Sequence, residues 1–387
     1  MNIFKTTLLL SYICIASFSA AIITPALPQI GSFFQLTSSS LSWIISIFLA
    51  GYVIGQLIYG PIAQKFGSLN ALRSGLIINL IGIIVCFIGI ECSIYTVLLA
   101  GRLITALGSA SGLACTFMLM HDLLNENEYK QAMPYTVLSF TLGIGAAVLI
   151  GGLVSEHLNW TVCFWVLLFH GIVMLVSTML FENSHKQPGK LNLRSILKNY
   201  WRELMNTRLI MFSLIVGLMS SFSYTYSSIA PLYANQNLHQ TSSQYGYWNL
   251  LNMAGMLIGG LLGASIIKRA GPKKLLLAGI IGLIPGCLSL FAIALSSGDH
   301  ALWFFITTMF IYIFSAFLFP AGSYFALKTT LDKANGASMM SFINMLSAVV
   351  SVIITGYLPT SIIVSFASVI SGFLIVVVIF AAILQLD

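Results

Sequence analysis

Long apolar segments recur along almost the whole chain, and short polar connections separate them. A helix needs about 20 mainly apolar residues to cross the hydrocarbon core of a bilayer. Twelve segments of about that length lie near residues 6–30, 41–60, 72–91, 96–119, 130–153, 160–182, 208–232, 245–267, 275–296, 301–327, 335–359 and 361–385. The pattern predicts an all-α membrane protein with twelve transmembrane helices.

Part of the pattern is repeated at about half the chain length. The segment 51–75 ends one apolar run and begins the next through a basic loop, and 255–279 does the same 204 residues later. The matched pairs are Gly51 and Gly255, Gly55 and Gly259, Lys65 and Arg269, Gly67 and Gly271, and Gly75 and Gly279. Such internal repeats are typical of transporters. We therefore expect two pseudo-symmetric six-helix bundles, at residues 1–182 and 208–387.

The longest polar stretch, residues 183–207, lies between these halves. Basic residues recur there every four positions, at Lys190, Arg194, Lys198 and Arg202, and apolar residues fill the other side. This pattern predicts an amphipathic helix on the membrane surface. We interpret the segment as a cytoplasmic linker.

Charge then orients the chain. Only 7% of the residues are charged and 58% are hydrophobic, whereas soluble domains usually carry about 25% charged residues. If twelve spans alternate, Arg102 lies within a span and every other Lys and Arg falls on one side. By the positive-inside rule, that side and both termini lie in the cytoplasm. We therefore expect a protein of the inner membrane. The net charge of +7 thus indicates contact with anionic lipid and does not imply nucleic-acid binding.

The first residues have a second interpretation. Lys5, an apolar run and the stretch Ser17-Phe18-Ser19-Ala20 resemble a signal peptide, whose cleavage would leave eleven spans. We expect the first helix to be retained. The six cysteines have no paired spacing, so neither a disulfide framework nor a zinc site is predicted. We expect no metal and no cofactor.

Arg102 is the main candidate for function in the first half. A charged side chain at membrane depth costs at least about 2.5–3.5 kcal/mol, so it should face a polar interior. Thr105 and Ser109 share its helical face, and Tyr52 and Gln56 are polar positions in the second span. We predict that these residues line a substrate cavity. The alternative is an Arg held by carbonyls or polar neighbours for structural reasons.

The second half is polar at different positions. Aromatic, amide and methionine side chains together suit an adaptable pocket for organic molecules. The predicted cavity residues here are Tyr224, Tyr226, Asn252, Tyr312 and Asn344. The alternative is that these residues pack between helices or lie in the interface belt.

The loop after the second span resembles the signature loop of the Major Facilitator Superfamily, through Gly60, Ala63, Lys65 and Gly67. Gln64 stands where the family has an Asp that helps to lock the two halves. The resemblance implies twelve helices in two bundles. It also implies a gating loop, for which the candidates are Gly60, Gln64, Lys65, Gly67, Arg73 and Asp122.

Other segments resemble motifs of the same superfamily. The run around Arg102 resembles its second motif, with Thr105 where Gln is usual, and residues 121–122 resemble the ending of the Bcr/CflA-type drug-efflux branch. Residues 143–152 resemble the antiporter motif through Gly143, Gly151 and Gly152, but the Gly-Pro pair is replaced by residues 147–148.

The acidic residues are absent from the span centres. A buried acid is what would hold a cationic drug, so we expect a neutral, zwitterionic or anionic substrate. His170 is a candidate proton relay, and the alternative is a histidine hydrogen-bonded to a neighbouring helix. Coupling through a peripheral acid or a substrate charge, or no coupling, also remains open.

Taken together, the sequence predicts a secondary transporter for a small organic molecule, with efflux of a drug-like compound or metabolite favoured. The first alternative is a carrier of an anionic metabolite such as a carboxylate siderophore. A passive facilitator or a transport-dead sensor is an alternative of a different class. An enzyme is not expected, because no span offers a nucleophile–base pair, paired acids or metal-ligand spacing. The expected partners are the substrate, the lipid bilayer and, if transport is coupled, protons.

Overall fold

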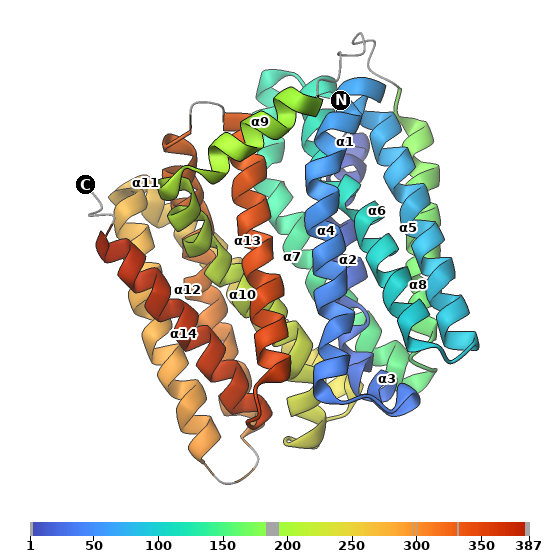
Figure 1. The fold of residues 1–387 in the computed structure, drawn as a ribbon, viewed down its shortest axis with the longest axis vertical. Helices are drawn as coiled ribbons and strands as arrows, with labels where there is room; N and C mark the ends of the chain where they lie inside the picture. The colour runs from blue at the N-terminus through green and yellow to red at the C-terminus, as the bar shows by residue number, and fades with distance from the viewer. Residues whose placement is uncertain (1–2, 183–192, 297, 299, 331–332, 384–387) are drawn as a thin grey trace. The chain divides into compact units, whose positions relative to one another are not determined.

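The computed structural model describes residues 3–182, 193–296, 298, 300–330 and 333–383, and every element within them is a helix (Figure 1). Residues 183–192, the first part of the expected linker, lie outside the described residues, and for 193–197 only the backbone is described. The elements are α1 (Ile3–Ser11), α2 (Cys14–Ala21), η1 (Thr24–Ala26), α3 (Leu27–Phe34), α4 (Ser38–Phe66), α5 (Ser68–Glu91), α6 (Tyr95–Leu123), α7 (Glu126–His157), α8 (Val162–Ser177), η2 (Thr178–Leu180), α9 (Leu193–Leu204), α10 (Thr207–Gln236), α11 (Ser242–Leu295), α12 (Ala301–Lys328), α13 (Lys333–Tyr357) and α14 (Ile362–Ile383).

Eleven helical segments in the described residues are long and apolar enough to cross a membrane. One of them, α11, has 54 residues and would be about 81 Å long at 1.5 Å per residue. A bilayer core is only about 30 Å thick, and the backbone of Gly271 interrupts α11 with non-helical angles (φ 82°, ψ 168°). α11 therefore holds two spans, and the described part of the chain has the twelve spans that the sequence predicts.

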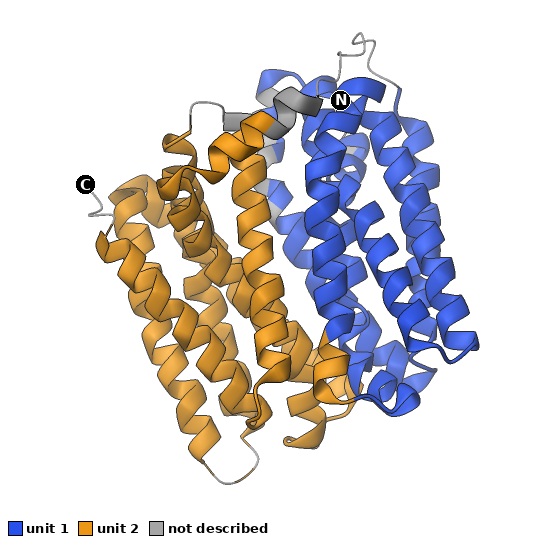
Figure 2. Cartoon of the chain, in the orientation of Figure 1, with its two compact units in different colours: residues 1–36, 43–192 blue, residues 37–42, 193–387 orange. Residues whose placement is uncertain are grey.

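The chain divides into two compact units (Figure 2). Unit 1 comprises Met1–Leu36 and Trp43–Asn192, and unit 2 comprises Thr37–Ser42 and Leu193–Asp387. α9 therefore clusters with unit 2, although the sequence suggested a separate linker over 183–207. The first residues of α4 cluster with unit 2 as well, while the rest of this helix belongs to unit 1.

The first span, expected over 6–30, is not one continuous helix. It consists of α1, α2, the 3-10 turn η1 and α3, with Pro25 and Pro28 at the starts of the last two elements. Proline has no backbone N–H and is tolerated at helix starts but not in helix interiors. The break is buried in unit 1, where the carbonyl oxygen of Ile22 lies directly against Gly151 of α7. A glycine of the antiporter-like segment thus accommodates the interrupted backbone.

The internal repeat is visible in the packing of each unit. Gly67 and Gly271 both have positive φ, at 88° and 82°, which favours glycine at these two turns. A Cβ atom at Gly51 would lie 2.6 Å from the backbone oxygen of Leu103 in α6. At Gly255 it would lie 2.6 Å from the backbone oxygen of Met309 in α12. Matched glycines therefore serve matched helix–helix contacts.

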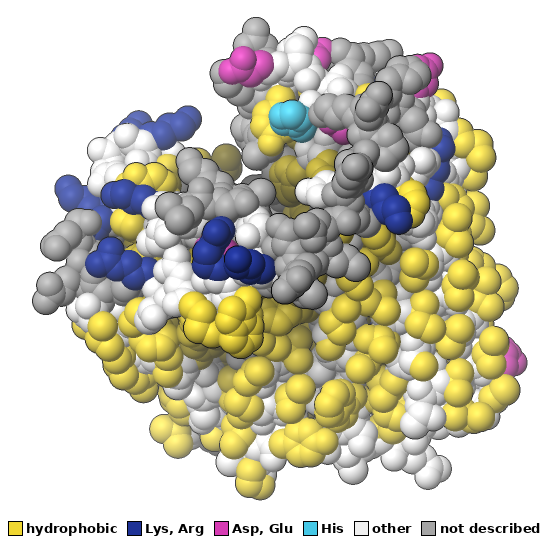
Figure 3. Space-filling model, turned by 45° about the horizontal axis from the view of Figure 1, so that its top comes forward, with side chains coloured by type: hydrophobic (Ala, Val, Ile, Leu, Met, Phe, Trp, Pro, Cys, Tyr) yellow, Lys and Arg dark blue, Asp and Glu magenta, His cyan; other side chains and the backbone are white. Residues whose placement is uncertain are grey.

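Side chains on the outside of the helices are mostly hydrophobic, as a lipid environment requires (Figure 3). The Lys and Arg side chains visible in Figure 3 gather in the upper part of the view, above most of this apolar surface. The separation of basic from apolar side chains is typical of a protein that spans a bilayer and has its charged residues in the adjoining water.

Candidate functional site

Arg102 of α6 is fully buried in unit 1. Its Nη1 donates a hydrogen bond of 3.0 Å to the backbone oxygen of Ser19 in α2. Its Cζ lies 4.3 Å from the centre of the Phe48 ring in α4, a cation–π contact worth about 2 kcal/mol or more when desolvated. The guanidinium is thus held among α2, α4 and α6 and does not face lipid.

Two nitrogens of this guanidinium, Nε and Nη2, have no hydrogen-bond partner among the described residues. A guanidinium carries five N–H donors, and leaving a buried donor unmet costs about 1–3 kcal/mol, or more when the group is charged. Arg102 therefore donates one hydrogen bond to Ser19 and still has two nitrogens, Nε and Nη2, that could donate to another acceptor.

The face of α4 that carries Phe48 continues through Tyr52 to Gln56, because these residues follow one another at intervals of four. Tyr52 is buried, and the Oε1 atom of Gln56 is buried with no hydrogen-bond partner in the described structure. The structure therefore places these two predicted residues on the same side of α4 as the ring that stacks on Arg102.

Thr105 and Ser109, which are predicted to line a cavity with Arg102, contact α5 in the structure. Both contact Asn79 of α5, whose Nδ2 donates to the Thr105 backbone oxygen (3.1 Å) and to Ser109 Oγ (2.7 Å). Ser109 Oγ in turn donates to the Thr105 oxygen at 2.8 Å. These groups join α5 to α6, and the sequence interpretation missed Asn79. Spacing shows which residues share a face of α6, but it does not show which neighbouring helix each side chain meets.

In unit 2, three predicted residues lie in one buried region of α10, α11 and α12. The rings of Tyr226 and Tyr312 are 5.9 Å apart in an edge-to-face arrangement. Thr308 donates to Asn252 Oδ1 at 2.9 Å, and Asn252 Nδ2 donates to Asn249 at 3.2 Å. The Tyr226 hydroxyl is buried beside Asn252 and Tyr245. This region offers aromatic surface, amides and a buried hydroxyl.

Asn344 and Tyr224 lie apart from that region. Asn344 of α13 is buried against Gly217 of α10, and its Oδ1 has no hydrogen-bond partner within the described ranges. Tyr224 is half-buried and stands two residues before Tyr226, so it points to a different side of α10. The five residues predicted for the second half are therefore not one cluster.

The predicted gating loop is a tight turn between α4 and α5. Gln64 and Lys65 are exposed at the end of α4, and Lys65 Nζ lies 4.9 Å from the centre of the Phe66 ring. Gly67 makes the turn with positive φ, whereas Gly60 lies within α4 with no neighbour close to the position of a Cβ atom. Gln64 and Lys65 are thus displayed to solvent at this end of unit 1.

Arg73 and Asp122 form hydrogen bonds that connect the start of α5 to the ends of α8 and α6. Arg73 donates to the hydroxyl (3.1 Å) and the backbone oxygen (3.0 Å) of Thr178, where α8 ends. Asp122 Oδ2 accepts a hydrogen bond of 3.2 Å from Ser68, the first residue of α5. A carboxylate at a helix N-terminus is favoured by the helix dipole, so Asp122 fastens the end of α6 to the start of α5.

His170 of α8 stacks on Phe18 of α2, with ring centres 4.6 Å apart. His170 thus contacts a neighbouring helix through its ring, and its role as a proton relay stays a prediction. Within the described residues, no three His, Cys, Asp or Glu side chains are grouped so that they would hold a metal ion.

Residues 9–353 match the family model described as Major Facilitator Superfamily. The chain belongs to this superfamily. Its fold agrees, because the structure of a peptide transporter POT in complex with sulfate superimposes with a TM-score of 0.80. That comparison covers 100% of this chain and 96% of the other at 15% sequence identity.

Two curated superfamily relatives bear names that concern efflux or resistance. The MFS-type efflux pump MMF1 of Mycosarcoma maydis is 30% identical over 181 residues, which cover 47% of this chain and 28% of the pump. The bicyclomycin resistance protein homolog of Haemophilus influenzae is 20% identical over 266 residues, covering 65% and 63%. The alignments span less than two thirds of either relative.

Proposed function

We propose that this protein is a secondary transporter that exports a small organic molecule by alternating access, and that it is not an enzyme. The observation that carries the proposal is Arg102, a fully buried cation in a membrane helix with two unpaired nitrogens. Retaining an unmet charge at this depth is costly, which favours a functional role over packing alone. Membership of the superfamily and the names of the relatives support transport and efflux.

The substrate is proposed to be neutral or anionic. Each unit holds a buried polar atom that lacks a hydrogen-bond partner among the described residues, Gln56 Oε1 in unit 1 and Asn344 Oδ1 in unit 2. Unit 1 thus offers the donors of Arg102 and an amide acceptor, and unit 2 by itself offers an amide acceptor and the aromatic surface of Tyr226 and Tyr312. Arg102 is closed off in this conformation, so a substrate would reach it only when helices of unit 1 move.

The membrane orientation follows from the basic loops. We propose an inner-membrane protein with Gln64, Lys65 and the loop at Gly271 on the cytoplasmic side, where an excess of Lys and Arg is retained. Both termini then lie in the cytoplasm.

The test is transport in proteoliposomes that contain the full chain. Arg102→Ala should lower the transport rate of an anionic probe by about tenfold or more, since a bond to a charged group is worth about 1.5–3 kcal/mol. Arg102→Lys keeps the charge but not the planar fork, and should transport at an intermediate rate. Lys274→Ala, which removes an exposed charge, is the matched control and should transport normally.

A folded Arg102→Ala protein that transports at the normal rate would overturn the role of Arg102. Size-exclusion profiles in detergent show whether each variant is folded.

A second candidate, a carrier specific for an anionic metabolite, is favoured by the two unpaired nitrogens of Arg102. The same proteoliposomes separate the two, because a specific anion carrier would not move a neutral probe. Applying a pH gradient to them tests proton coupling. His170→Phe keeps a ring that can stack on Phe18 but cannot carry a proton, so it tests whether coupled transport needs the imidazole of His170. A rate that ignores the gradient would indicate a facilitator.

A further inference from the structure

The outer side of α9 carries aromatic and basic side chains together. Lys198, Trp201, Arg202 and Met205 are all exposed, with Trp201 at 64% and Met205 at 61% of their full surface. Their spacing of three and four residues places them on one side of the helix. We call these four residues the α9 outer face.

The opposite side of α9 is fixed to unit 2. Glu203 is only 3% exposed, and the Tyr200 hydroxyl forms a hydrogen bond with Ser338 of α13. Burial of the Tyr200 hydroxyl raises its pKa. Arg202 Nη2 lies 3.4 Å from Glu203 Oε1, so the acidic side chain of this turn is turned inward. The α9 outer face is left positively charged.

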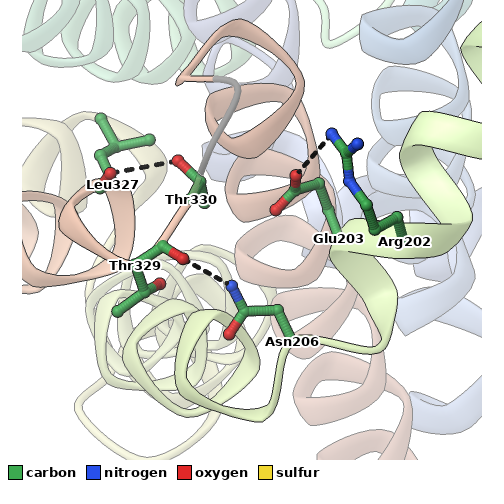
Figure 4. A network of polar contacts seen from close by, with 6 residues as sticks. All are labelled: Arg202, Glu203, Asn206, Leu327, Thr329 and Thr330. Atoms are coloured by element: carbon green, nitrogen blue, oxygen red, sulfur yellow. Dashed lines mark hydrogen bonds and ion pairs between the residues drawn. The ribbon is translucent and has the colours of Figure 1, made fainter.

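The junction between α9 and α10 holds the helix at an angle to the membrane spans (Figure 4). Asn206 caps α10 by accepting from the backbone N–H of Leu209 at 3.2 Å, and its Nδ2 donates to the Thr329 backbone oxygen at 3.0 Å. In Figure 1, α9 runs across the ends of α10 and α13 instead of extending α10. Since α10 and α13 are spans, α9 lies at the surface of the bilayer.

Two further basic residues adjoin this junction. Arg208 is exposed at the start of α10, and Lys328 is exposed at the end of α12, next to Thr329. With Lys198 and Arg202, this end of unit 2 carries four exposed basic side chains on α9, at the start of α10 and at the end of α12, and Arg202 is the one that pairs with Glu203. This combination suits the headgroup region, where Trp is enriched and each Lys or Arg contributes about 1 kcal/mol of attraction to anionic lipid.

We propose that the α9 outer face, with Arg208 and Lys328, is a docking surface for the headgroups of anionic phospholipids. Trp201 and Met205 enter the boundary between headgroups and acyl chains, while Lys198, Arg208 and Lys328 contact phosphate. The surface belongs to unit 2 alone and does not depend on what the protein transports.

The experiment titrates phosphatidylglycerol into the full-length protein in a neutral detergent. Trp201 emission is isolated as the difference between the wild type and Trp201→Phe, because the chain has five other tryptophans. Phosphatidylglycerol should shift this emission to shorter wavelength at a lower mole fraction than phosphatidylcholine does. Arg202 is left unchanged in the test variants because it pairs with Glu203.

The double variant Lys198→Gln/Arg208→Gln should weaken binding of phosphatidylglycerol about 25-fold, since 1 kcal/mol per charge corresponds to about fivefold. Lys273→Gln/Lys274→Gln removes two exposed charges elsewhere in unit 2 and should bind nearly as the wild type does.

Four outcomes would overturn the proposal. An equal response to the two lipids would show apolar partitioning only, and the same response to free glycerol phosphate would show a site for soluble anions. No change in Trp201 emission would show that the face does not meet lipid. An equal loss in the control variant would show attraction to the whole protein and not to α9. Matching size-exclusion profiles establish that the variants are folded.

Discussion

At position 82 of α5, a methyl group would overlap the backbone nitrogen and Oγ1 of Thr105 in α6. We predict that Gly82→Ala lowers the free energy of unfolding by about 1–3 kcal/mol, the usual cost of overpacking a well-packed contact. Thermal unfolding in detergent, followed by tryptophan fluorescence, measures the change. Gly60→Ala is the control, because no atom lies within 4 Å of the Cβ position there. A loss as large in Gly60→Ala would contradict the explanation by helix contact.

The sequence predicts some residue-scale features of the site and not others. The cost of a charge in lipid is enough to place Arg102 in the protein interior, and the structure agrees. The energetic cost of a charge in lipid does not predict which neighbouring helix, α4 or α5, a given side chain of α6 contacts. The pattern therefore predicts a cavity position for Thr105 and Ser109 but does not predict that both contact Asn79. Asn79 is one amide in an apolar span, and its pairing depends on the rotation of α5, which the pattern of one helix does not fix.

At the scale of elements, Asn206 has two separate functions, as the cap of α10 and as a donor to Thr329 at the end of α12. We predict that Asn206→Ala destabilises the start of α10 by about 0.5–2 kcal/mol, the typical effect of losing a cap. Amide hydrogen exchange should rise in residues 207–210. Asn206→Asp retains the capping oxygen but loses the donor, so it should preserve protection in α10 while loosening the contact with α12. Equal exchange in both variants would show that the cap is unimportant.

Element boundaries follow closely from the sequence where one span is one unbroken helix, as for α12, expected at 301–327 and observed at Ala301–Lys328. The boundaries of a helix cannot be predicted from the sequence pattern where contacts with other helices determine them. The break in the first span needs Gly151 of α7 beside the Ile22 carbonyl, a contact between segments far apart in the chain. The pattern of α9 predicts its amphipathic character, but its attachment to unit 2 depends on Ser338 and Thr329.

At the scale of the whole molecule, the two units use one packing plan with different chemistry. The glycine contacts of α4 with α6 match those of α11 with α12, as Leu103 and Met309 illustrate, 206 residues apart. By the same offsets, Arg102 corresponds to Thr308, and Phe48 corresponds to Asn252. At this position the Arg102 guanidinium lies over the Phe48 ring in unit 1, and the Thr308 hydroxyl donates a hydrogen bond to the Asn252 amide oxygen in unit 2. The repeat therefore preserves helix packing, whereas the polar side chains have diverged, as expected if they serve substrate selection.

The proposed topology of the whole molecule is tested by the native Cys92, the one cysteine whose side chain is exposed. Cys92 follows α5, at the opposite end of this helix from the basic turn at Gly67. We predict that an impermeant maleimide labels Cys92 in intact cells and that Cys92→Ser abolishes the labelling. In that background, Gln64→Cys places a thiol at an exposed position of the basic loop and should be labelled only after permeabilisation. Since α5 spans the membrane, its two ends must react from opposite sides, and labelling of Gln64→Cys in intact cells would show the reverse orientation.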